Sequence, residues 1–498
     1  MLKKLKELKE YITKLEYLNS TIAVLSWDAM VNTPKKGKAY RGELLGYLSG
    51  EYYKLITDNQ VKEFIDYFNT QKNLDEISKA MVKKIEKDYN QIKKIPEDMY
   101  KQYSIDASNS SAAWEEAKNA NDFSIFKPHL EKMVDYKKKF VDYLGYEDNK
   151  YDTLLDMFEP GMTVKKLDEV FSEVRDAIVT LLKKIETSKV DVRCDFFTKE
   201  FSKKDQEEFS KFVLSKMNYD FEDRGRIDES EHPFTTNFGK NDVRITTHYY
   251  ENDFRSALFG CIHEAGHAIY EQNISDDLKG TGLAEGASMG IHESQSRFYE
   301  NIIGRSKEFW SYFYPEAQKR FHQFDGISVE EFYKGINKVE PSLIRIEADE
   351  LTYSLHIIIR YELEKMLIND ELKVEEIPEA WNNKYREYLG VEPKSDMEGV
   401  LQDMHWSDGS FGYFSSYALG NLYGAQIFNI MKKDIQDMDI QLSKGNMDEI
   451  YNWLAENVYK HGAVYKPEEL IKKITDEGLK AKYFIKYLNE KYSEIYNL

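Results

Sequence analysis

The chain has 498 residues, of which 41% are hydrophobic, and its net charge at pH 7 is −19. This acidity argues against nucleic acid and anionic membranes as partners, because both attract basic surfaces. Only 10 prolines and 26 glycines interrupt the chain, a composition that favours helices over a turn-rich β fold. No segment approaches the roughly 18 apolar residues of a membrane span, and the charged amphipathic start does not resemble a signal peptide. We therefore expect a cytoplasmic protein.

Apolar residues recur at helical spacing through roughly the first 225 residues. They predict helices over Leu2–Leu25, Ala39–Thr57, Val61–Thr70, Leu74–Lys94, Pro96–Ala120, Phe123–Leu144 and Val164–Ser188. Residues 232–250 differ, because they are rich in threonine, β-branched and aromatic residues and are interrupted at Gly239-Lys240-Asn241-Asp242. This pattern predicts a β-hairpin, whose edge could pair with an extended peptide. After residue 273 the pattern is helical again.

No linker or low-complexity segment divides the chain. We therefore expect a mainly α fold, with one large helical domain over residues 1–498 and a small β-sheet that flanks a long active-site cleft. Residues 1–225 would form its helical N-terminal part. Residues 226–430 would carry the functional motifs, and residues 431–498 would form the C-terminal helices.

The motif His-Glu-x-x-His occupies residues 263–267, within a predicted amphipathic helix over residues 253–272. Two histidines four positions apart lie on one helical face, so His263 and His267 can bind the same metal ion. Glu264 lies beside them, where it can accept a proton from an activated water molecule and later protonate a leaving amine. The pattern is typical of metallopeptidases. The alternative is a pair of histidines that are hydrogen-bonded in a core.

A catalytic zinc ion usually has three protein ligands. A third histidine at the end of an extended motif is excluded, because residue 273 is asparagine, so we expect a carboxylate. The candidates are Glu271, Glu285, Glu293 and Glu300. Glu271 would need a strained geometry and Glu285 lies in a predicted loop. Spacing alone does not separate Glu293 from Glu300, and a solvated glutamate is the alternative for each.

Four further motifs accompany the histidine motif. They are Asp242-Val243-Arg244-Ile245-Thr246, His292-Glu293-Ser294-Gln295-Ser296, Ile344-Arg345-Ile346-Glu347-Ala348-Asp349 and Gly399-Val400-Leu401-Gln402-Asp403-Met404-His405-Trp406. In this order, the five motifs resemble those of the carboxypeptidase Taq family of metallocarboxypeptidases. The resemblance implies a gluzincin-type peptidase with Glu293 as third ligand and Glu264 as general base. It also implies a saddle-shaped molecule, often a homodimer, that removes C-terminal residues one at a time.

The expected cofactor is one divalent metal ion per chain. Two histidines and one glutamate suit Zn²⁺, and Co²⁺ fits the same ligands. The expected partners are peptide substrates, whose terminal carboxylate suits a planar guanidinium. The resemblance favours Arg345 for this role and Arg244 for ordering the edge strand. The alternative is a structural pair of each arginine with Asp349 or Asp242.

The oxyanion formed by attack of water needs a hydrogen-bond donor besides the metal. His405 and Tyr413 are the candidates, with Tyr423 in reserve, because residues 409–423 resemble the Tyr/Gly-rich wall of the family. For any single tyrosine, core packing is the alternative. Residues that could orient His405 or a metal ligand are Gln402, Asp403 and His292.

His248 stands where many members of the family carry arginine, which bears on substrate preference rather than on catalysis. Two rival functions share the metal site: an endo-oligopeptidase and a dipeptidyl carboxypeptidase. Their products, internal fragments or dipeptides, distinguish them from a carboxypeptidase. A non-catalytic, metal-stabilised interaction protein is a rival of another class. Glu264 argues against it, because a structural metal site needs no base.

Overall fold

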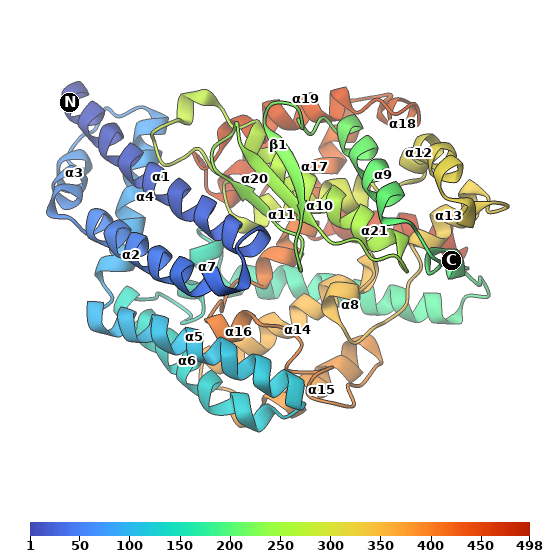
Figure 1. Ribbon diagram of the computed structural model, residues 1–498, viewed down its shortest axis with the longest axis horizontal. Coiled ribbons are helices and arrows are strands. Elements are labelled where there is room, and N and C mark those ends of the chain that lie inside the picture. The colour runs from blue at the N-terminus through green and yellow to red at the C-terminus, as the bar shows by residue number, and fades with distance from the viewer.

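A computed structural model describes all 498 residues, and its fold is mainly helical, as expected (Figure 1). No helix combines the length and apolarity needed to cross a membrane. The helices that precede the sheet are α1 (Leu2–Val31), α2 (Lys38–Ile56), α3 (Asn59–Asn69), α4 (Glu76–Lys93), α5 (Glu97–Ala120), α6 (Phe123–Leu144), α7 (Asp152–Phe158), α8 (Val164–Thr187) and α9 (Lys203–Lys216). All the helices predicted in this region are present, although α1 continues past Leu25 to Val31.

Side-chain caps explain why the starts of these helices could be predicted. Asp58, Asp75, Asp122 and Thr163 each accept a hydrogen bond from a backbone N–H in the first turn of the following helix. Such a cap satisfies one of the N–H groups that has no partner within the helix. The boundary is therefore set by a residue that is visible in the sequence.

The helices after the sheet confirm the second helical region. They are α10 (Phe254–Gln272), α11 (Met289–Arg297), α12 (Lys307–Arg320), α13 (Val329–Ile336), α14 (Glu350–Ile368), α15 (Ile377–Leu389), α16 (His405–Asp408), α17 (Ser415–Asp434), α18 (Met438–Leu442), α19 (Asp448–Asn457), α20 (Pro467–Thr475) and α21 (Lys482–Tyr496). Helix α11 continues directly into a π-helical turn over Phe298–Ile303.

The small sheet has three strands in the order β1-β3-β2. Strands β2 (Thr235–Asn237) and β3 (Val243–Thr247) are antiparallel and form the predicted hairpin. Strand β1 (Gly225–Glu229) pairs with β3 in parallel and was not predicted. Its sequence, Gly-Arg-Ile-Asp-Glu, contains one apolar side chain, so it lacks the alternation that signals a half-buried strand.

The sheet lies beside α10, which contacts both β2 and β3. Figure 1 shows α1–α4 (blue) at the left of the molecule, α5 and α6 (cyan) below them, and the sheet and α10 (green) near the centre. One hydrophobic cluster runs from Leu8 in α1 to Tyr496 in α21. Helices α10, α14 and α17 are buried over most of their length, so polar residues on them have few routes to solvent and mark candidate functional positions.

Candidate active site

Helix α10 carries the histidine motif, and it begins where the sequence predicted. The Asp253 carboxylate accepts a hydrogen bond from the backbone N–H of Arg255 at 2.7 Å and caps the helix. Further along the helix, His263 and His267 lie one turn apart, and the centroids of their rings are 5.0 Å apart. Both histidines therefore present their nitrogen atoms to the same space.

Glu293 on α11 faces this space. Its Oε2 atom lies 3.8 Å from Nε2 of His263 and 3.5 Å from Nε2 of His267. One ligand atom from each of the three residues lies within 4.8 Å of the other two. Two imidazole nitrogens and one carboxylate oxygen are the donor set of many catalytic zinc sites, so the residues fit a divalent metal ion.

Electrostatics favour the ligand forms of two of these side chains. Burial lowers the pKa of His267 to about 4, which keeps its imidazole neutral. Burial alone would raise the pKa of Glu293, but the charges of His263 and Arg297 outweigh it and hold that pKa below the usual range. Both side chains are therefore deprotonated at neutral pH, as metal ligands must be.

Two glycines allow the three helices of the site to approach one another. A Cβ atom on Gly266 of α10 would lie 2.6 Å from the carbonyl oxygen of Gln295 on α11. A Cβ atom on Gly420 of α17 would lie 2.5 Å from Cγ of Glu293. Because real Cβ atoms do not come this close to other atoms, only glycine fits at either position. These contacts set the depth at which Glu293 reaches the histidines.

Glu300 is not part of the ligand cluster. Its Oε2 atom lies 2.9 Å from Nδ1 of His263, and Nη1 of Arg297 lies 3.3 Å from the same oxygen. The residue sits in the π-helical turn after α11, a feature that is frequent at functional sites. A carboxylate on the far nitrogen of a histidine ligand fixes the tautomer and the ring orientation. Glu300 is therefore placed to orient His263.

His267 has a longer chain of partners. Its Nδ1 atom lies 2.7 Å from Nδ1 of His292, and Nε2 of His292 lies 2.7 Å from Oε1 of Glu271. His292 is thus in contact with His267, which is where a residue that orients this ligand would lie. Glu271 therefore contacts His292 and none of the three clustered residues. Glu285 pairs with Lys84 of α4 at 3.1 Å. Of the four carboxylates considered, Glu293 is the one that lies among the histidines.

Glu264 is buried beside the cluster, and burial raises the pKa of its carboxyl group. The hydroxyl of Thr235 on β2 lies 2.6 Å from its Oε2 atom and 2.9 Å from its backbone oxygen. The sheet therefore orients the candidate base. Thr235 lies in the predicted hairpin, but nothing in its local sequence distinguished it from the neighbouring threonine.

Arg345 is 7% exposed and is held by Asp403. Its Nε and Nη2 atoms donate to Oδ1 of Asp403 at 2.9 and 2.8 Å, and Nη1 donates to the hydroxyl of Tyr353 at 3.2 Å. The other oxygen of Asp403 accepts from Arg360 at 2.6 Å. Asp403 therefore contacts the two arginines and makes no hydrogen bond to His405. Asp349, the suggested partner of Arg345, instead caps α14.

Arg244 lies at the sheet, away from Arg345. Its guanidinium donates two hydrogen bonds to Asp242, at 2.7 and 2.8 Å, and stacks 4.5 Å from the ring of Trp27 on α1. These contacts attach α1 to β3, and the pair with Asp242 is the structural pair given above as the alternative for Arg244. His248, the departure from the family pattern, donates a hydrogen bond from Nδ1 to the Ser230 carbonyl oxygen at 3.1 Å.

The rings of His405, Tyr413 and Tyr417 contact one another and form an aromatic wall, which contains the two candidate oxyanion donors. The rings of His405 and Tyr413 are stacked with centroids 5.6 Å apart, and burial lowers the pKa of His405 to about 4. Burial and the nearby charge of Glu293 together raise the pKa of Tyr413 to about 12. Tyr417 was not predicted, yet its hydroxyl lies 3.3 Å from Nε2 of His405. Its position four residues after Tyr413 was the available signal.

Tyr423 does not belong to this wall. Its side chain is fully buried, and its hydroxyl donates to Oε1 of Glu159 at 2.9 Å. The reserve assignment of Tyr423 to substrate is therefore not supported by its position, and the alternative of core packing describes it. Tyr413 precedes α17, whereas Tyr423 lies about two turns into that helix, and the two side chains have different neighbours.

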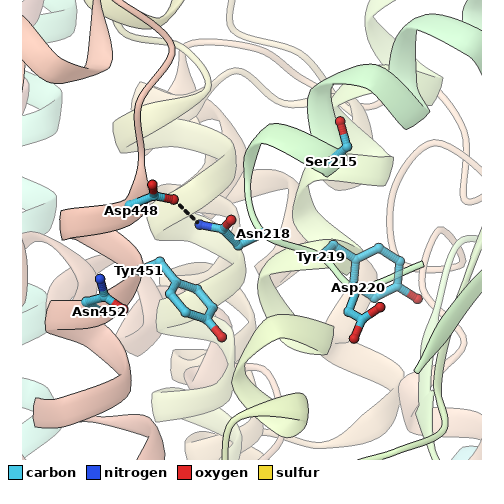
Figure 2. Close-up of a pocket in the computed structure, with 7 residues that line it drawn as sticks. All are labelled: Ser215, Asn218, Tyr219, Asp220, Asp448, Tyr451 and Asn452. Carbon is cyan, nitrogen blue, oxygen red and sulfur yellow. Dashed lines mark hydrogen bonds between the residues drawn. The ribbon is translucent and has the colours of Figure 1, made fainter. Parts of the chain in front are cut away.

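A hollow of about 440 Å³ lies elsewhere, between the end of α9 and the start of α19 (Figure 2). Its lining is polar, and the side chain of Asn218 donates to Asp448 at 3.1 Å across it. None of the predicted site residues lines this hollow. The hollow is therefore separate from the candidate active site, which comprises the residues on α10, on α11 and in the aromatic wall.

Comparisons with known proteins show the family to which the chain belongs. A family model described as carboxypeptidase Taq (M32) metallopeptidase matches residues 7–492. Carboxypeptidase 1 of Bacillus subtilis is 48% identical over 495 residues, which cover 99% of each chain. Thermostable carboxypeptidase 1 of Pyrococcus furiosus is 38% identical over 94% of each chain. The crystal structure of the M32 carboxypeptidase from Deinococcus radiodurans R1 superposes with a TM-score of 0.96, at 35% identity and with 100% of both chains covered.

The helical fold, with two histidines and a glutamate converging beside a buried glutamate, is that of a metallopeptidase. The chain belongs to the carboxypeptidase Taq (M32) family, because the family model spans nearly its whole length. It is a metal-dependent carboxypeptidase.

Proposed function

We propose that this carboxypeptidase hydrolyses the last peptide bond of peptides with broad specificity, using a metal ion held by His263, His267 and Glu293. The observation that carries the proposal is the convergence of these three ligands to within 4.8 Å, next to Glu264. The metal, Zn²⁺ in the simplest case, supplies Lewis-acid activation of water and of the scissile carbonyl when it is bound. Co²⁺ is the second choice for the same ligands.

Glu264 acts as the general base and then as the general acid. It accepts a proton as water attacks the carbonyl carbon, and it returns that proton to the leaving amine. Its raised pKa suits both steps, because a carboxyl group that titrates closer to neutrality both accepts and releases a proton readily. The hydrogen bond from Thr235 to Oε2 orients the carboxylate for this exchange.

Arg345 binds the terminal carboxylate of the substrate. A guanidinium has five N–H groups, and the hydrogen bonds to Asp403 and Tyr353 use one on Nε, one on Nη2 and one on Nη1. One N–H therefore remains on each terminal nitrogen, which matches the two oxygens of a carboxylate. Binding of the chain end at this position selects the last peptide bond for cleavage.

His405 and Tyr413 donate hydrogen bonds to the oxyanion. The lowered pKa of His405 keeps its ring neutral at physiological pH, so it donates as an imidazole. The raised pKa of Tyr413 keeps its hydroxyl protonated. Tyr417 supports the pair through its contact with His405.

We further propose that residues 1–498 act as one domain, that the protein is a homodimer and that it works in the cytoplasm. The continuous core from Leu8 to Tyr496 supports the single domain. The free thiols of Cys194 and Cys261 fit a reducing compartment. The homodimer rests on the resemblance to the family, and light scattering coupled to size-exclusion chromatography measures it.

A mass-spectrometric time course on a mixed peptide library tests the activity. Metal-loaded protein is compared with chelated protein. The proposal expects a ladder in which C-terminal residues are lost singly, and only when metal is present. Dipeptide steps or internal cuts would instead assign the protein to the dipeptidyl carboxypeptidases or endo-oligopeptidases. Absence of cleavage despite bound metal would support the non-catalytic alternative.

A further inference from the structure

The wall that carries His405 and Tyr413 is attached to one buried carboxylate, that of Glu364 on α14. Trp406, the residue after His405, donates from its indole nitrogen to Oε1 of Glu364 at 2.7 Å. Gly412, the residue before Tyr413, donates from its backbone N–H to Oε2 at 2.8 Å. The two ends of the segment between the candidate oxyanion donors therefore meet at the same side chain.

The carboxylate has no route to solvent. Glu364 is 0% exposed, and the hydroxyl of Tyr151 is its third hydrogen-bond donor. Lys137 on α6 and Arg360, one turn earlier on α14, are the cationic groups near it. Each of the three donors would remain buried and unsatisfied without this acceptor, which is unfavourable for a buried polar group.

Local hydrogen bonds, among them one from the backbone N–H of Ser410 to the His405 carbonyl at 2.8 Å, shape the segment together with tertiary contacts. Helix α16 is one turn long, and the chain then passes through Gly409 and Gly412 at φ angles of +82° and +96°. Such angles favour glycine. At Gly412 a Cβ atom would also lie 2.6 Å from the carbonyl oxygen of Leu154. Among the tertiary contacts of the segment, Glu364 is the one that binds the neighbours of both His405 and Tyr413.

We propose that Glu364 is a positioning residue for the reaction: it fixes the spacing of His405 and Tyr413 and so determines how well the oxyanion is stabilised. The proposal rests on the proposed function, in which these two residues bind the oxyanion. Glu364 itself touches neither substrate nor metal ligands. Its effect should appear in the transition state and not in substrate binding, because oxyanion donors act on charge that develops during the reaction.

The test is Glu364→Gln, with Glu362→Gln as the matched control. Glutamine keeps the size of the side chain but replaces one acceptor oxygen with an NH2 group, which opposes the donors of Trp406 or Gly412. Glu362 lies on the same helix, but it contacts Lys384 and Tyr388 of α15. In Glu364→Gln we expect kcat to fall about tenfold or more, with KM changed less than about threefold and metal content unchanged.

Inhibition constants give a readout that a merely structural role would not move. A phosphinic peptide mimics the tetrahedral oxyanion, whereas a free amino acid mimics the product. In Glu364→Gln the phosphinic peptide should lose affinity by about the same factor as kcat, and the amino acid should bind as before. Trp406→Phe, which removes one donor and keeps an aromatic ring, should show the same pattern with a smaller change, and it serves if the glutamine variant fails to fold.

An unchanged kcat in Glu364→Gln would overturn the inference. A fall in kcat that is fully explained by a smaller metal-loaded fraction would also overturn it. Equal losses of affinity for the phosphinic peptide and the amino acid would do the same. The wild type and Glu362→Gln are assayed in parallel. If neither of them releases single C-terminal residues, the proposed function has failed, which is distinguishable from failure of the positioning role alone.

Discussion

The metal side of the site and the aromatic wall are built in different ways. His263 and His267 lie one turn apart on a single helix, and close packing at glycines brings Glu293 to them. Arg345 and Tyr413 come from separate segments that have little regular structure, and buried carboxylates hold both segments. The comparison teaches that a site can combine positions set by helical spacing with positions set by buried charge. Positions of the first kind should be sensitive to an increase in side-chain volume at the glycines. Positions of the second kind should be sensitive to replacement of the buried carboxylate.

Replacing the base on the metal side should have the largest effect. In Glu264→Gln we expect kcat to fall by about 10²–10⁴, because general acid–base catalysis contributes about that much. Metal should remain bound, since Glu264 is not among the three ligands. Initial rates and metal analysis of the purified protein measure both. Glu285→Gln is the control, because Glu285 pairs with Lys84 outside the site. Normal turnover of metal-loaded Glu264→Gln would refute the assignment.

A volume change on the metal side should come next. Gly420→Ala places a Cβ atom against Glu293, so we expect metal affinity to fall by about 10–100-fold, as it does when the support of a ligand is disturbed. Titration against a chelator measures this affinity. The control is Gly46→Ala on α2, where no atom lies within 4 Å of the new methyl group. That change should leave metal binding unaltered and stabilise the helix slightly. Equal metal affinity in both variants would contradict the packing argument.

Removing the charge of Asp403, two residues before His405, should affect substrate binding. Asp403→Asn removes the anion shared by Arg345 and Arg360. We expect KM to rise about tenfold and stability to fall by about 3–5 kcal/mol, as it does when a buried pair loses one partner.

Asp242→Asn is the matched control for Asp403→Asn, because it breaks the partly exposed pair with Arg244. It should change stability by about 1 kcal/mol at most and leave KM nearly unchanged. Steady-state kinetics and urea unfolding measure these effects. A larger rise of KM in Asp242→Asn would assign carboxylate binding to Arg244 instead.

The last prediction concerns the pH dependence of stability, a feature that both regions share. Burial raises the pKa of Glu159, which accepts from Gly290 at the start of α11, and of Glu364 on the wall, each to about 7. Between pH 4.5, near the value of an ordinary glutamate, and pH 7, the folded protein then binds more protons than the unfolded chain. Each group therefore stabilises the fold fully below pH 4.5. That contribution is lost as pH rises through 7, by about 1.4 kcal/mol per pH unit at most.

Urea unfolding of the wild type and of Glu159→Gln across this pH range measures the effect. As pH rises from 4.5 through 7, the free energy of unfolding of the wild type should fall relative to that of Glu159→Gln. The glutamine variant should therefore show the flatter profile. A difference that is independent of pH would mean that Glu159 titrates at an ordinary value.

Much of the metal side could be predicted from the sequence, because its information is local. The four-residue spacing of His263 and His267 specifies one helical face whatever the rest of the fold does. The cap at Asp253 marks the start of that helix. The helices before the sheet and the hairpin were predicted for the same reason, since periodicity and caps act over a few residues. Resemblance of the motifs to a known family favoured Glu293, although spacing alone left it equal to Glu300.

Tertiary structure decided the remaining features. Glu293 and Glu300 lie two turns apart, and only the packing of α11 against α10 directs one to the histidine cluster and the other behind His263. Strand β1 forms because β3 offers it a pairing edge, not because of its own pattern. Asp403 binds Arg345 rather than His405, and Tyr423 faces Glu159 rather than the wall. Each of these outcomes depends on buried polar groups that meet partners far away in the chain, and the energy of such contacts leaves no periodic trace in the sequence.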